Sequence, residues 1–64
     1  MSLKSARIAQ GLTQKKLAQM ALISQSYYNE IESGKKKNPS TKVMQRIIQI
    51  LDTNLDIFFN NDIA

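Results

Sequence analysis

The sequence predicts a compact all-α domain made of five short helices. Glycine and proline are scarce, with two glycines and one proline among the 64 residues, and both residue types disfavour helix interiors. Apolar residues recur at spacings of three and four, which is the period of a helix buried on one face. A serine, threonine or asparagine stands before each such segment, and these residues cap helix N-termini.

The first two helices are each marked by a cap. Ser2 is expected to cap the first helix, and Gly11 to end it in the left-handed conformation. Thr13 is expected to cap the second helix, over about residues 14–21, which turns Leu17 towards the core.

Ser24 is expected to cap the third helix, over about residues 25–33, and Gly34 to end it. The second and third helices are therefore joined by two or three residues around Leu22. Such a short link forces two packed helices into a sharp angle, so the sequence predicts a helix-turn-helix.

The fourth helix is predicted to start at Pro39 and Ser40 and to bury an apolar face that ends at Leu51. Asn54 is expected to cap a short fifth segment. Residues 1–59 then form one domain, and residues 60–64 form a C-terminal tail.

The composition excludes several classes of function. The chain has no histidine and no cysteine, so it lacks the commonest general base, the commonest metal ligand and any thiolate. We therefore expect no enzyme, no metal and no cofactor. The sequence has no apolar run near the roughly 20 residues that span a bilayer and no signal-peptide pattern, which predicts a cytoplasmic protein with no membrane partner.

Positive charge is concentrated in two blocks. The net charge is +4, and residues 1–16 and 35–46 each carry lysines and an arginine but no acidic residue. This distribution predicts a basic face that attracts a polyanion.

The stretch "GLTQKKLAQMALISQSYYNEIESGKKKNPS" resembles the lambdoid phage repressor and Cro type of helix-turn-helix, the XRE family. The resemblance extends from about Leu3 to Phe59 and predicts a lambda-repressor-like fold. The family pattern of apolar and small side chains is met at Leu17, Ala18, Ala21, Ile23, Tyr28 and Ile31. The chain departs from the pattern at Leu22 and Asp52, where the family favours glycine; a leucine in the left-handed region costs about 1–2 kcal/mol.

The resemblance implies that the third helix lies in the major groove of double-stranded DNA. Its exposed residues would contact base edges, and they are Gln25, Ser26, Asn29 and Glu30. It also implies that Gln14 binds a phosphate while bonding Gln25, and that Arg7 and Glu32 form a structural ion pair. The remaining predicted contacts with the DNA backbone are Tyr27, Lys35, Lys36, Lys37 and Asn38.

The predicted function is sequence-specific DNA binding by a transcriptional regulator, a repressor. The alternative is a small helical protein-interaction module, such as an antitoxin-like partner or an adaptor, with little DNA binding. No small-molecule ligand is evident. A weak homodimer is expected because one such domain reads few base pairs, and Ile50 and Ile57 are its predicted surface because they lie off the apolar stripes of their helices.

Overall fold

The computed structural model describes residues 2–36, 39–54 and 56–59, and every regular element in these ranges is a helix. The helices are α1 (Leu3–Ala9), α2 (Gln14–Met20), α3 (Gln25–Ser33), α4 (Thr41–Leu51) and α5 (Asp56–Phe59). The predicted all-α class and the order of the elements are confirmed. Lys37 and Asn38, which were predicted to contact DNA, lie outside the described residues.

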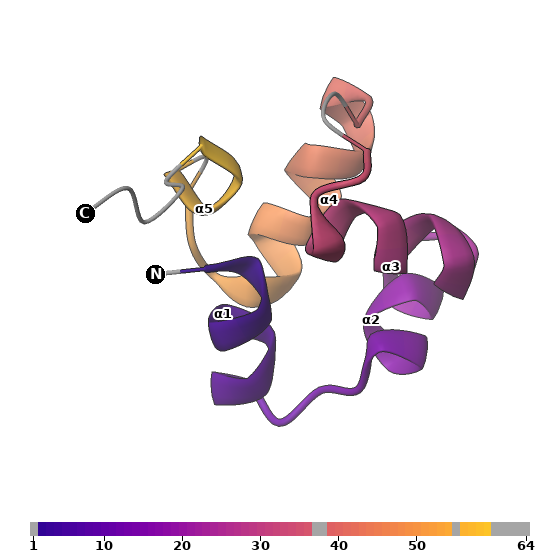
Figure 1. Cartoon of the computed structure of the whole chain (residues 1–64). Coiled ribbons are helices and arrows are strands. Elements are labelled where there is room, and N and C mark those ends of the chain that lie inside the picture. The colour runs from indigo at the N-terminus through magenta and orange to yellow at the C-terminus, as the bar shows by residue number, and fades with distance from the viewer. Residues whose placement is uncertain (1, 37–38, 55, 60–64) are drawn as a thin grey trace.

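The helices pack in two groups around α4. Helix α2 contacts α3 and α4, and α1 contacts α5. Figure 1 shows α2 and α3 together on the right of the view, with α1 and α5 on the left and the end of α4 between them. The α2–α3 pair is thus one side of the molecule, supported from behind by the other helices.

Side-chain caps define where the first four helices start. The hydroxyl of each cap residue accepts a hydrogen bond from the backbone N–H three positions later, at 3.0–3.2 Å. These caps are Ser2, Thr13, Ser24 and Ser40. Asn54 Oδ1 accepts from the backbone N–H of Asp56 at 2.9 Å, at the start of α5. The caps satisfy N–H groups that have no partner inside the helix, and all five were predicted from the sequence.

The helix-turn-helix supplies the centre of the core. Tyr28, Leu17 and Ile47 are the largest fully buried side chains, and they come from α3, α2 and α4. The other buried hydrophobic residues are Leu3, Ala6, Ala18, Ala21, Ile31, Val43, Leu51 and Ile57. Because the same two helices fill the core and carry the candidate binding surface, packing fixes how that surface is presented.

The predicted dimer surface is wrong at Ile57. This side chain is 6% exposed and belongs to the core cluster, and Ile50 is half-buried against that cluster. The reason is that α5 is a single turn that packs on α1, so its inward side could not be deduced from a repeating pattern. Within the described residues, Ile57 is therefore not available to form an isologous patch with Ile50.

The turn between α2 and α3 contains a leucine in a conformation that favours glycine. Leu22 has φ 63° and is 72% exposed. Its N–H donates to Gln19 O at 3.2 Å, and the N–H of Ile23 donates to Ala18 O at 3.0 Å. The chain thus makes the tight turn of the helix-turn-helix with leucine, at the steric cost that left-handed backbone imposes on a side chain with a Cβ.

We expect Leu22→Gly to raise the free energy of unfolding by about 1 kcal/mol. Removing the left-handed strain gains about 1–2 kcal/mol, and the greater freedom of glycine in the unfolded chain returns part of it. Urea denaturation measures the change. Leu22→Ala is the matched control, because it removes the same exposed side chain and keeps the Cβ. An equal gain in both variants would show that the strain is not the cause.

Candidate nucleic-acid interface

A row of polar side chains lies on the outer face of α3. Gln25, Ser26, Asn29 and Glu30 are all exposed, whereas Tyr28 and Ile31 on the opposite face are buried. The spacing of four residues between Gln25 and Asn29, and between Ser26 and Glu30, puts each pair on the same side of the helix. The structure therefore brings the four predicted base-contacting residues together on one face.

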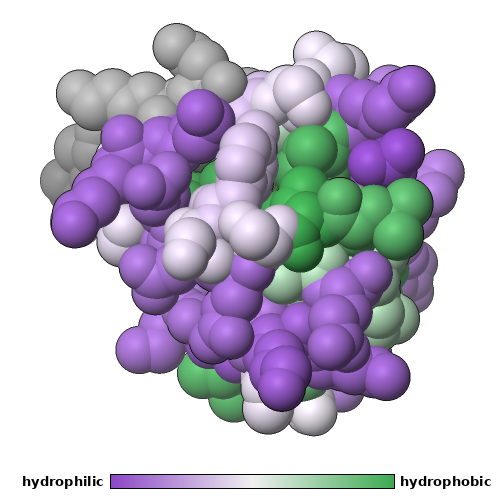
Figure 2. All heavy atoms as spheres, turned by 90° about the vertical axis from the view of Figure 1, so that its right-hand side faces the viewer, coloured by the Kyte–Doolittle hydropathy of each residue, from purple (hydrophilic) through white to green (hydrophobic). Residues whose placement is uncertain are grey.

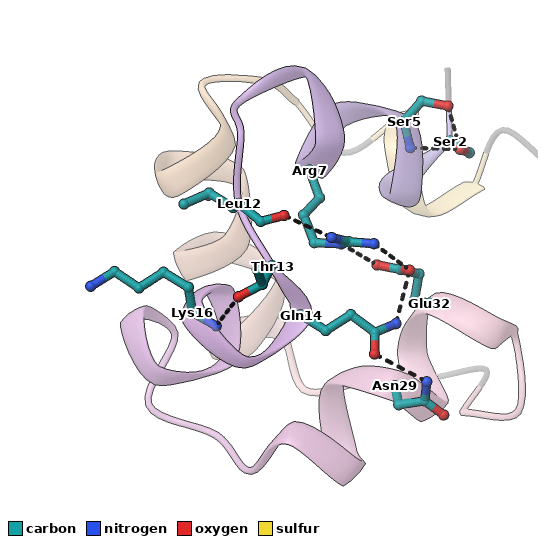
Figure 3. A network of polar contacts seen from close by, with 9 residues as sticks. All are labelled: Ser2, Ser5, Arg7, Leu12, Thr13, Gln14, Lys16, Asn29 and Glu32. Carbon is teal, nitrogen blue, oxygen red and sulfur yellow. Dashed lines mark hydrogen bonds and ion pairs between the residues drawn. The ribbon is translucent and has the colours of Figure 1, made fainter.

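Gln14, the first residue of α2, joins this row to the interior. Its Nε2 donates to Glu32 Oε1 at 3.0 Å, and its Oε1 accepts from Asn29 Nδ2 at 3.3 Å (Figure 3). The resemblance implied a bond between Gln14 and Gln25. Within the part of the chain that the structure describes, the Gln14 amide instead bonds the Glu32 carboxylate and Asn29.

Arg7 and Glu32 form the predicted ion pair. Arg7 Nε donates to Glu32 Oε2 at 2.9 Å and Arg7 Nη2 donates to Oε1 at 3.2 Å, and the side chains are 11% and 7% exposed. Arg7 Nη1 also donates to Leu12 O at 2.7 Å. This bidentate pair ties α1 and the α1–α2 loop to the end of α3, and Figure 3 shows it continuing through Gln14 to Asn29.

The pair changes the pKa values of the groups around it. Burial acts to raise the pKa of Glu32. Hydrogen bonds from Arg7 and Gln14 act in the opposite direction, as does the nearby Tyr28 hydroxyl. Together they outweigh burial and hold the pKa of Glu32 below its ordinary value of 4.5. The bond to Glu32 raises the pKa of Arg7. Burial, with the Glu32 carboxylate, raises the pKa of Tyr28, although its hydroxyl makes no well-formed hydrogen bond within the described ranges. Glu32 is therefore an anion at neutral pH.

We expect the ion pair to make stability depend on pH in the acid range. Since folding lowers the pKa of Glu32, its contribution is complete above about pH 4.5 and is lost as the pH falls through the lower folded pKa. Urea denaturation from pH 7 to pH 3 should show this loss, and Glu32→Gln should reduce the pH dependence. The matched control is Glu30→Gln at an exposed position, and an identical slope in both variants would contradict the role of Glu32.

The chain turns back on α3 where that helix ends. Gly34 has φ 87°, and the N–H of Lys36 donates to Glu30 O at 3.0 Å. This turn places Lys36 Nζ 5.1 Å from the centre of the Tyr27 ring. Tyr27 is half-buried against the core cluster, so its ring lies under the lysine instead of standing free at the groove. Lys35 and Lys36 are exposed and put positive charge beside the polar row.

The side chains on this face determine which kind of ligand it can bind. The described residues contain no group of three or more histidine, cysteine, aspartate or glutamate side chains that could hold a metal ion. Within the same ranges, no helix has the length and apolar character needed to cross a membrane. What α3 does present is two amides, a hydroxyl and the Glu30 carboxylate beside lysines. The amides, the hydroxyl and the lysines suit a polyanion with hydrogen-bonding edges.

The comparison with protein families identifies the family to which this chain belongs. A family model described as helix-turn-helix matches residues 3–58. The chain belongs to the helix-turn-helix family. The match covers α1 to α4 and most of α5, and it supports the lambda repressor and Cro type of domain that the sequence resembles. Comparisons with curated proteins and with solved structures give no match.

Membership of the helix-turn-helix family makes this chain a DNA-binding regulatory domain. Sequence reasoning did not find the bonds from Gln14 to Glu32 and Asn29, nor the interaction of Lys36 with the Tyr27 ring. No local signal in the sequence marks these contacts, because they depend on how the helices pack.

Proposed function

We propose that this helix-turn-helix chain is a sequence-specific transcriptional regulator that reads the major groove of double-stranded DNA with α3. The observation that carries the proposal is the exposed row of Gln25, Ser26, Asn29 and Glu30, in which Asn29 is hydrogen-bonded to Gln14. Amides and hydroxyls both donate and accept hydrogen bonds, as base edges require. A helix that only supported a core would gain nothing from tying an exposed asparagine to a buried ion pair.

The residues around the row are suited to hold the DNA backbone. Lys35 and Lys36 are exposed at the end of α3, and lysine neutralises phosphate and releases its counterions. Gln14 uses one Nε2 hydrogen on Glu32, which leaves the other free to donate to a phosphate. Glu30 has a different role on this face: it accepts from a cytosine amino group or repels phosphate at wrong sites.

A salt titration tests DNA binding itself. We expect Lys35→Ala with Lys36→Ala to weaken binding to every duplex and to flatten the slope of log affinity against log salt by about 0.9 for each phosphate that is no longer neutralised. Binding is measured by fluorescence anisotropy between about 50 and 200 mM salt, a range of ionic strength over which phosphate contacts change affinity strongly. Lys4→Ala is the control, since Lys4 is exposed on α1. An unchanged slope in the double variant would show that these lysines do not contact phosphate.

We also propose that two copies act together as a repressor. A single domain of this size reads too few base pairs to select one genomic site, and two-fold pairing on half-sites about 34 Å apart solves this problem. Bound at a promoter, such a pair excludes polymerase by occupancy. Gel shifts with a palindromic duplex and with one half-site test the pairing: equal affinity for both would exclude it.

One observation favours the alternative of a protein-interaction module. Figure 2, which looks onto the α2–α3 side, shows a small hydrophobic area within a largely hydrophilic face. Met20 and Leu22, at the end of α2 and in the turn after it, are 45% and 72% exposed. A protein partner could cover them. The two functions differ in salt dependence, because binding through apolar contacts changes little over a range of salt that strongly weakens phosphate contacts.

A further inference from the structure

We propose that Asn29 presents its carbonyl oxygen to the DNA and thereby selects a base with an amino group in the major groove, adenine or cytosine. The proposal rests on the function proposed above and deepens it, because it assigns one residue of the α3 row a preference between base types. It is argued from the donor-to-acceptor direction of the hydrogen bonds that run from Arg7 through Glu32 and Gln14 to Asn29.

The direction of these hydrogen bonds is set at the ion pair. Arg7 donates to both oxygens of Glu32, at 2.9 and 3.2 Å, and the carboxylate is ionised beside this guanidinium. An ionised carboxylate can accept hydrogen bonds but cannot donate one. Whichever atom of Gln14 lies 3.0 Å from Glu32 Oε1 must therefore be its nitrogen, because an oxygen there would face another acceptor.

The orientation of the Gln14 amide in turn fixes which atom of Asn29 it contacts at the surface. With its Nε2 on Glu32, its Oε1 is the atom that meets Asn29, and that oxygen accepts from Asn29 Nδ2 at 3.3 Å. Figure 3 shows the result, with the nitrogen of Asn29 turned to Gln14 and its oxygen pointing away from the network. Rotating the Asn29 amide by half a turn would set two oxygens against each other. Asn29 is exposed, so its outward oxygen is free to meet a ligand.

Base edges in the major groove differ in what they offer such an oxygen. Adenine and cytosine present amino groups, which donate, whereas guanine presents N7 and O6 and thymine presents O4, all acceptors. A fixed carbonyl oxygen gains a hydrogen bond from the first pair and meets repulsion from the second. Asn29 Nδ2 keeps a second hydrogen, which can donate to N7 of adenine, so adenine is favoured over cytosine.

The test is selection from a pool of randomised duplexes with the 64-residue chain and its variants. We expect the wild type to enrich adenine or cytosine about tenfold or more over guanine and thymine at one position of one strand. Asn29→Ala should abolish that preference and leave the other positions unchanged. Gln14→Met removes the bonds that orient Asn29, so guanine and thymine should rise to within about threefold of the amino bases there.

Gln19→Met is the matched control, the same substitution at an exposed position of α2, and it should leave the preference unchanged. Equal enrichment of adenine and guanine at the position that depends on Asn29, or an unaltered preference in Gln14→Met, would overturn the proposal while sequence-specific binding stands. Enrichment of no sequence by the wild type would overturn the proposed function, and this inference with it.

A measurement without DNA keeps the test independent of affinity. In the nuclear magnetic resonance spectrum of the free protein, the Asn29 amide protons should exchange with water more slowly than those of Gln19. In Gln14→Met, with the fold checked by circular dichroism, the Asn29 protons should exchange as fast as those of Gln19. Equal exchange rates for Asn29 and Gln19 in the wild type would show that the bond to Gln14 does not hold the amide, and the proposal would fail.

Discussion

Replacing Arg7 with methionine is expected to lower the free energy of unfolding by about 3–5 kcal/mol, because it leaves the Glu32 carboxylate buried without its cation. The side chain of Glu32 is 7% exposed, so water cannot replace the missing partner. A single core in a domain of this size rarely supplies more than about 3–5 kcal/mol in total. The variant should therefore be largely unfolded at 25 °C, as measured by circular dichroism at 222 nm with urea or osmolyte titration.

The double variant Arg7→Met with Glu32→Met distinguishes an unpaired charge from poorer packing. It should be more stable than either single variant, since it buries no charge. The matched control is Arg46→Met, at a half-buried arginine of α4, which should change stability by less than about 1 kcal/mol. A double variant as unstable as Arg7→Met would mean that the pair acts mainly through the arginine bond to Leu12 O, which neither variant can make.

Local features of the fold could be predicted from the sequence because their causes are local. Ser2, Thr13, Ser24 and Ser40 cap helices through bonds that span three residues, so the neighbouring sequence suffices to find them. The short link between two helices predicted the helix-turn-helix, but it did not fix the left-handed conformation of Leu22, which has φ 63°. A residue such as Ile57 could not be placed, because one helical turn has no period from which an inward face can be deduced.

The candidate site divides in the same way. That Gln25 and Asn29 are exposed follows from the spacing of the buried residues on α3. The partners of Gln14 depend instead on how α2 crosses α3 and on where α1 places Arg7. These are tertiary distances set by packing, and the sequence contains no local signal for them. Among the described residues, Gln14 therefore bonds Glu32 and Asn29, whereas the resemblance implied Gln25.

The same network links stability to recognition. The buried Arg7–Glu32 pair is connected to Gln14 by one hydrogen bond, and Gln14 is connected to Asn29 on the surface by a second. A buried ion pair is seldom worth more than an apolar replacement of similar volume, so stability alone does not explain its use. It does provide a fixed acceptor that orients amides further out. Variants of the pair that still fold should therefore alter the order of base preferences as well as stability.

Gln25→Ala is expected to weaken binding to the preferred duplex by about 1–3 kcal/mol, or about 5-fold to 150-fold, and to leave binding to random duplex nearly unchanged. Gln25 is the first residue of α3 and is exposed, so its amide can reach both N6 and N7 of an adenine. Alanine is tolerated at this position without loss of helix, which keeps the change confined to base recognition. Anisotropy titrations of both duplexes at one salt concentration measure the two affinities.

Gln45→Ala is the matched control, because it removes an exposed glutamine from α4 and should change neither affinity. The ratio of the two affinities is the informative quantity. Phosphate contacts contribute equally to every sequence, so removing a hydrogen bond to a base lowers the ratio, whereas removing one to the DNA backbone lowers both affinities together. An equal decrease on both duplexes would therefore assign Gln25 to the DNA backbone and would leave base reading to Ser26, Asn29 and Glu30.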